Sequence, residues 1–116
     1  MKKIIKLSKH AILANRDTRL LEVEVPEWGG TLFARTLSVA DAVEFEEKKS
    51  SIPEGKIIAL YLCYTLADEA GVPLFLTDEV DELCKKDADV MLRLFHLCLN
   101  HNKMGESNEK ERTASF

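Results

Sequence analysis

The sequence predicts an α+β fold, in which an N-terminal antiparallel β-hairpin packs on a bundle of about four α-helices. Apolar and polar residues alternate along two runs on either side of a Pro/Gly segment, which is the pattern of a hairpin. From Ser38 onward, apolar residues recur at helical spacing instead. The 116 residues fit one domain, and a content of 46% hydrophobic and 31% charged residues is ordinary for a globular protein.

The N-terminal third contains a short helix and the hairpin. Ser8 can cap a helix over residues 8–15. The hairpin is expected at about residues 19–36. Side chains alternate in both strands, with Leu21, Val23 and Val25 opposed to Glu22 and Glu24, and Leu32 and Ala34 opposed to Phe33 and Arg35.

The rest of the globular part is predicted to be helical. Ser38 and Asp41 have the spacing of a capping box at the first helix. The second helix is apolar almost all round and should therefore be the central element. Thr77 is expected to cap the third helix. The helices are placed at about 38–49, 52–67, 78–86 and 88–101.

The last helix has an apolar stripe and a polar face. The stripe is wide and should face the core. The polar residues could form a contact face or be solvated, and we expect them to be solvated. The stripe contains Val90, Met91, Leu94, Phe95 and Cys98, and the polar face contains Arg93, His96, Asn100 and Lys103. We expect one globular domain over residues 1–103 and a polar, disordered tail over 104–116.

Charge and cysteine content restrict the partners and the compartment. The net charge of −4 argues against nucleic acid, which needs clustered Lys and Arg. No run reaches the ~20 apolar residues of a membrane span, and no apolar core of a signal peptide is present. The cysteines Cys63, Cys84 and Cys98 are odd in number and form no C-x-x-C pair, which indicates a reducing cytoplasm.

No pattern in the sequence indicates catalysis. His96 and His101 are five residues apart on one helix and cannot clamp a metal as an i, i+4 pair does. The acids of residues 78–82 lack the glycine of a calcium loop and fit a solvated helix face. Gly29 and Gly30 are too few for a phosphate loop. We expect no enzyme, no cofactor and no metal site.

The order of the elements nevertheless resembles a known family. The most specific pieces are "VPEWGG" (residues 25–30) and "DEAGVPLF" (residues 68–75). With an "ILA" segment before them and an acidic step and a last helix after them, they resemble the tail assembly chaperones of long-tailed, non-contractile (lambda-like) phages and prophages. The resemblance covers about residues 12–102.

This resemblance implies a non-enzymatic binding protein in the cytoplasm of a bacterial host. Such a chaperone coats the tape-measure protein, keeps it soluble, helps to recruit tail-tube protein, and is absent from the finished virion. Self-association into a homo-oligomer and a longer, frameshifted form would also fit the family. The alternatives are a small structural head–tail connector or tail-completion protein, and a bacterial regulatory adaptor.

The partner-binding residues are expected in the two specific pieces and directly beside them. They are Pro26, Trp28, Gly29, Gly30, Phe33 and Phe75. Trp28 has two interpretations. Its ring either contacts a partner at the hairpin tip or folds back as a lid on the core.

Overall fold

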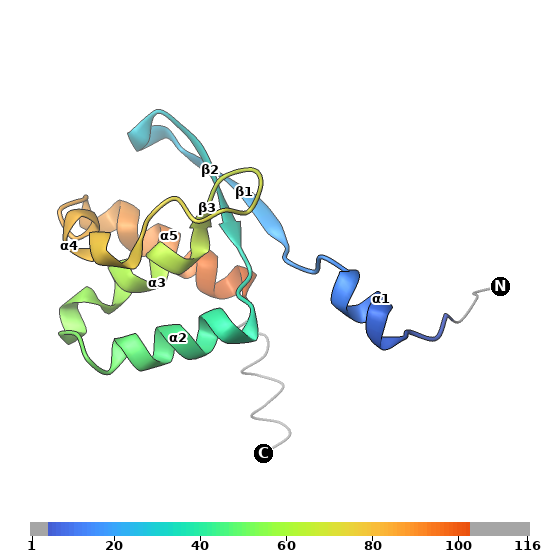
Figure 1. Cartoon of the computed structure of the whole chain (residues 1–116). Helices are drawn as coiled ribbons and strands as arrows, with labels where there is room; N and C mark the ends of the chain where they lie inside the picture. The colour runs from blue at the N-terminus through green and yellow to red at the C-terminus, as the bar shows by residue number, and fades with distance from the viewer. Residues whose placement is uncertain (1–4, 103–116) are drawn as a thin grey trace, which may run out of the picture.

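The computed structural model describes residues 5–102. They form a small antiparallel sheet with helices against one of its faces, and a short N-terminal helix that stands apart (Figure 1). The α+β prediction is confirmed. The elements are α1 (Lys9–Ala14), β1 (Leu20–Val25), β2 (Gly30–Arg35), α2 (Val39–Lys49), α3 (Ile57–Thr65), β3 (Leu66–Ala67), α4 (Val80–Leu83) and α5 (Ala88–His101).

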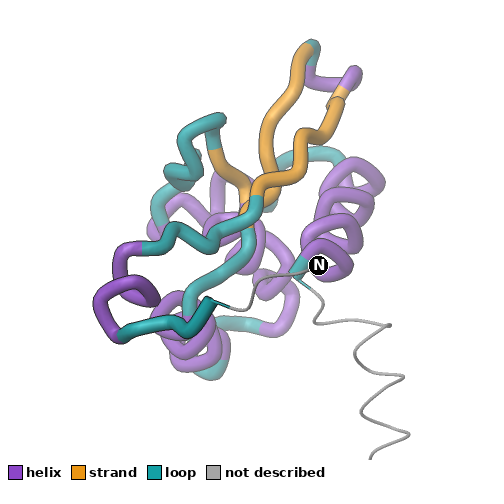
Figure 2. Tube along the Cα trace, turned by 90° about the vertical axis from the view of Figure 1, so that its right-hand side faces the viewer, coloured by secondary structure: helices purple, strands orange, loops and turns teal. Residues whose placement is uncertain are grey.

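The hairpin of β1 and β2 follows the alternation of the sequence. Val23 lies opposite Leu32, and Val25 lies opposite Gly30. Val23, Val25 and Leu32 are buried, whereas Glu22 and Glu24 on the other face are exposed. The two strands rise beyond the helices, and their tip is the most distant part of the sheet (Figure 2).

A third strand corrects the predicted extent of the second helix. The helix expected over 52–67 begins with the 3-10 helix Glu54–Lys56, continues as α3 and ends at Thr65. Leu66 is extended, with φ −79° and ψ 129°, and pairs with Ala34 in the strand order β1-β2-β3. Since a fully buried strand and a buried helix are both continuously apolar, periodicity does not separate them.

The predicted third helix is also shorter than expected. Residues 78–86 form the end of the 3-10 helix Thr77–Glu79, the single turn α4 and a turn that leads to α5. Thr77 is not its cap. The Glu79 carboxylate reaches back and accepts a hydrogen bond from the Leu76 amide at 2.7 Å.

The starts of α1, α2 and α5 have side-chain caps. The Ser8 hydroxyl accepts from the Ala11 amide, and Ser38 accepts from the Asp41 amide, both at 3.1 Å. The Asp87 carboxylate accepts from the amide of Val90 at the start of α5. Because a side-chain acceptor satisfies an amide that has no partner in the first turn, each cap fixes where its helix begins.

The core surrounds α3, which packs against α2, α4 and α5. Leu60 and Leu62 are almost fully buried on α3, and Leu94 of α5 packs in the same cluster. Each such leucine contributes about 1.5–3 kcal/mol through burial. The ring of Tyr61 makes edge-to-face contacts with Phe45 and Phe95, at centroid distances of 5.3 and 5.5 Å.

Residues at the end of α5 form hydrogen bonds to the open end of the hairpin. The Asn102 side-chain oxygen accepts from the Leu37 amide at 2.8 Å, and its nitrogen donates to the carbonyl of Arg35 at 3.2 Å. His101 Nε2 lies 3.0 Å from the carbonyl oxygen of Arg19. The start of β1 and the end of β2 are therefore both tied to the same helix terminus.

Within residues 5–102, no helix is long and apolar enough to cross a membrane. Cys63 and Cys98 are buried, as their apolar surroundings predict, and Cys84 is exposed. The predicted polar tail of residues 104–116 lies outside the described residues, so its disorder and the division into one domain and a tail stay predictions.

Candidate functional site

The hairpin tip is a single turn of 3-10 helix, Pro26–Trp28, closed by Gly29. Gly29 has φ 79°, a left-handed conformation that glycine adopts without steric cost. Its amide donates to the Pro26 carbonyl at 3.0 Å. Pro26 and Gly29 therefore form the turn that joins the two strands, as the hairpin prediction expects.

An ion pair holds this tip on α5. Arg93 donates two hydrogen bonds to the two carboxylate oxygens of Glu27, at 2.8 and 2.9 Å. Such a two-pronged pairing fixes orientation as well as distance. The guanidinium lowers the pKa of Glu27 from 4.5 to about 2. Arg93 is exposed, as expected of the polar face, and it also contacts the hairpin tip through this pair.

The position of Trp28 agrees in part with both interpretations, the lid on the core and the contact with a partner. Its side chain is half-buried and packs against the hydrophobic core, which agrees with the lid interpretation. The Lys86 ammonium lies 5.3 Å from the ring centroid, a cation–π distance. The exposed remainder of the indole is available for a partner.

Beside Lys86, an apolar groove runs between α3, α4 and α5. Its volume is about 270 Å³, and it is lined by Gly55, Ile58, Ala59, Leu83, Cys84, Lys86, Ala88, Met91 and Leu92. Leu92 is 41% exposed at its edge. Lys86 belongs to both features, because its ammonium lies over Trp28 while its side chain lines the groove. We refer to this surface as the tip groove.

The tip groove has the character of a protein-binding surface. Its lining is mostly apolar, with Lys86 as the charged residue, and an exposed apolar surface of this kind favours association over solvation. Met91 is unbranched and can adapt to different side chains, which suits a groove that receives an amphipathic helix.

Four of the six predicted partner-binding residues lie close together at the hairpin tip. Pro26, Trp28, Gly29 and Gly30 lie together at the tip. Phe33 lies farther along β2, half-buried and paired with Ala67. Phe75 is in the connector between β3 and the 3-10 helix at Thr77, where it packs against the core.

Sequence reasoning missed the residues of the groove and the ion pair. One signal for Leu92 was present, since it is a large apolar residue of α5 outside the predicted stripe. Lys86 and Arg93 carried no comparable signal, because their partners are distant in sequence. Glu27 and Arg93 are 66 residues apart.

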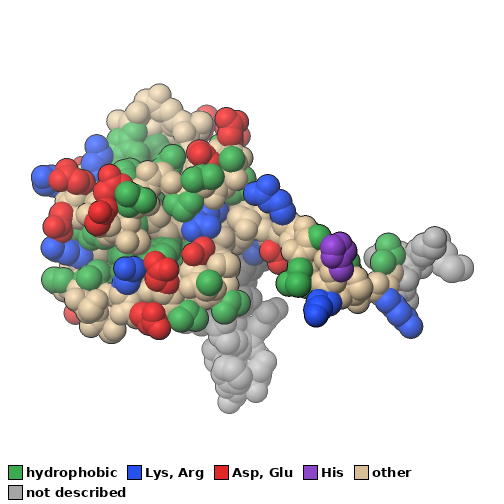
Figure 3. Space-filling model, in the orientation of Figure 1, with side chains coloured by type: hydrophobic (Ala, Val, Ile, Leu, Met, Phe, Trp, Pro, Cys, Tyr) green, Lys and Arg blue, Asp and Glu red, His purple; other side chains and the backbone are tan. Residues whose placement is uncertain are grey.

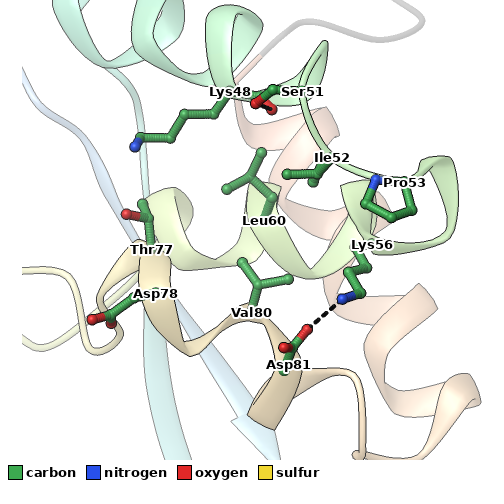
Figure 4. A pocket seen from close by; sticks show the side chains of 10 residues that line it. All are labelled: Lys48, Ser51, Ile52, Pro53, Lys56, Leu60, Thr77, Asp78, Val80 and Asp81. Carbon is green, nitrogen blue, oxygen red and sulfur yellow. Dashed lines mark hydrogen bonds and ion pairs between the residues drawn. The ribbon is translucent and has the colours of Figure 1, made fainter.

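A second hollow of about 380 Å³ lies on the other side of α3 (Figure 4). On one side it is lined by Lys48, residues 51–53 and Lys56. On the other side it is lined by Thr77, Asp78 and Asp81, with Leu60 and Val80 between. Lys56 and Asp81 form an ion pair at 2.7 Å, which raises the pKa of Lys56 and lowers that of Asp81. Asp81 of the acidic segment therefore has a partner within the protein.

The part of the chain that the structure describes shows neither a cluster of metal ligands nor an activated thiol at Cys63 or Cys98. Among residues 5–102, no three His, Cys, Asp or Glu side chains are placed to hold a metal ion. Burial raises the pKa of the Cys63 and Cys98 thiols to about 11, so neither is a thiolate at neutral pH.

Comparison with known proteins identifies the fold. No protein-family model and no curated protein sequence matches this chain. Among solved structures, the tail assembly chaperone of bacteriophage HK97 matches with a TM-score of 0.58 and 22% sequence identity. The match covers 72% of this chain and 84% of that one. The chain therefore has the fold of a phage tail assembly chaperone.

Proposed function

We propose that this protein is a tail assembly chaperone of a long-tailed, non-contractile (lambda-like) phage or prophage. It binds the tape-measure protein in the host cytoplasm, keeps it soluble, helps to recruit tail-tube subunits and leaves before the virion is complete. The observation that carries the proposal is the fold likeness to the HK97 chaperone over 84% of that chain. The order of motifs in the sequence supports it independently.

The tip groove is consistent with a binding role, and we propose it as the contact site for the client. A tape-measure protein is long and largely helical, and an apolar helix face fits a groove lined by Ile58, Met91 and Leu92. The exposed part of Trp28 extends the contact beyond Lys86. The function requires no catalytic group.

Co-expression tests the proposal. The tape-measure protein of the same phage is produced with and without this chain, and its soluble fraction is measured. The proposal expects more soluble client with the chain present. A Leu92→Glu variant should lose this effect, because it places a carboxylate in the apolar groove.

Two controls make the result specific. Leu76 is 69% exposed and does not line the groove, so a Leu76→Glu variant should keep its activity. Mass spectrometry of purified particles separates the proposal from its alternative. A chaperone is absent from the virion, whereas a head–tail connector or tail-completion protein is retained there.

A further inference from the structure

Residues 5–18 form an arm that stands clear of the body of their own chain (Figures 1 and 3). Its helix α1 contains no buried residue. The hydrogen bonds described for the arm are internal, such as those from the amides of Ala11 and Ile12 to Ser8. The described hydrogen bonds to the body begin at Arg19. Its amide donates to the Thr36 hydroxyl at 2.9 Å, and its carbonyl accepts from the Thr36 amide at 3.1 Å.

The arm exposes apolar side chains that its own fold does not use. Ile5, Leu7, Ile12 and Leu13 are between 55% and 77% exposed. A helix of six residues is not stable by itself in water, so α1 requires a surface to pack on. The arm is also basic, since Lys6, Lys9 and Arg16 outnumber Asp17.

The outward face of α2 has the complementary character. Val39 is 81% exposed and Val43 is 50% exposed. The shallow surface around them is lined by Val39, Ala42, Val43, Glu46, Glu47 and Ser50. We call it the α2 face. Figure 3 shows apolar side chains beside acidic ones along the lower edge of the body, where α2 lies.

We propose that the arm of one copy binds the α2 face of a second copy of this chain. The apolar residues of the arm cover Val39 and Val43, and its basic residues lie beside Glu47. The neighbouring Glu46 is already paired with Lys49 at 3.3 Å. The dimensions agree, because α1 is about 9 Å long and α2 is about 16 Å long at 1.5 Å per residue. Opposite charges at the rim fix the direction of the arm on the helix.

The contact joins two different surfaces of the chain, so it can produce two kinds of assembly. A reciprocal exchange of arms closes a dimer, whereas a head-to-tail exchange produces an open row of subunits. Both use the same arm and the same face. The inference concerns self-association and does not depend on the identity of the client.

Cysteine cross-linking between singly substituted chains tests the contact directly. A Leu13→Cys chain is mixed with a Val43→Cys chain, and both carry Cys84→Ser to remove the exposed native thiol. A disulfide requires Cα atoms about 4.4–6.8 Å apart. We expect a covalent heterodimer under mild oxidation. A Leu76→Cys chain, substituted at an exposed site outside the α2 face, should not cross-link to Leu13→Cys.

Light scattering of the full chain gives the second readout. We expect self-association to weaken about tenfold when Ile12 and Leu13 are both replaced by Ser, with the melting temperature unchanged because neither side chain is buried. A monomer at every concentration would overturn the inference. So would an intrachain Leu13–Val43 disulfide in a doubly substituted monomer, since the arm would then pack on its own α2.

Discussion

The carboxylate of Glu27 and the guanidinium of Arg93 join the hairpin tip to α5 by two hydrogen bonds of 2.8 and 2.9 Å. This pair fixes Trp28, the next residue, between the core and Lys86. The tip is therefore a positioned element of the fold, and Lys86, which lies over its tryptophan, also lines the tip groove.

Replacing Arg93 by Ala should loosen the tip without unfolding the core. Both partners of the ion pair lie at the surface, where such pairs contribute little to global stability. We expect faster amide hydrogen exchange at the tip, including the Gly29 amide, and a nearly unchanged melting temperature. A Glu27→Arg, Arg93→Glu double variant should restore the slow exchange. Unchanged exchange in Arg93→Ala would mean that the pair does not position the tip.

The same ion pair should give the hairpin tip a defined pH dependence. The pKa of Glu27 is lowered from 4.5 to about 2 in the folded chain, so its stabilising effect is complete above pH 4.5 and is lost as the pH falls through 2. Exchange at the tip should be slower in the native chain than in Glu27→Gln at neutral pH. The difference should shrink as the pH approaches 2 and vanish below it, and a constant difference would contradict the pairing.

Removing the hydroxyl of Tyr61 should not destabilise the protein. This hydroxyl is buried without a hydrogen-bond partner, whereas the Tyr64 hydroxyl donates to Glu44 at 2.7 Å. Tyr61→Phe keeps the aromatic contacts and should raise the free energy of unfolding by about 1 kcal/mol or leave it unchanged. Tyr64→Phe should lower it by about 1 kcal/mol. Denaturant unfolding compares the two, and a larger loss in Tyr61→Phe would be inconsistent with this structure.

Asn102 should matter more for stability than its exposed neighbour Asn100. Its side chain bonds to the backbone of Leu37, Arg35 and Cys98, at 2.8, 3.2 and 3.0 Å. Asn102→Ala should lower the free energy of unfolding by about 1–3 kcal/mol, because it leaves partly buried backbone groups without partners. Asn100→Ala should be close to neutral in the same thermal unfolding measurement. Equal effects would show that the Asn102 bonds are not structural.

Local signals in the sequence predicted most of the fold. Alternation predicted the buried residues Val23, Val25, Leu32 and Ala34 of the hairpin, although Leu21 is exposed. Ser8 and Ser38 marked helix starts because capping depends on residues close in sequence. The strand at Leu66 was missed, because its character as a strand depends on pairing with Ala34.

The candidate site was less accessible to sequence reasoning. Trp28 could be placed at a turn, but its half-buried position depends on the core, on Lys86 and on the Glu27–Arg93 pair. These contacts join residues that are far apart in the chain. The groove beside them is formed by three helices, and no single segment carries its pattern.

The most direct test of the central claim is the soluble fraction of the tape-measure protein when it is co-expressed with this chain. The account predicts a clear increase with the native chain and with Leu76→Glu, and the loss of that increase with Leu92→Glu. A Trp28→Ala variant whose melting temperature is retained should also protect the client less. A client that is no more soluble with the native chain than without it would contradict the assignment as a chaperone.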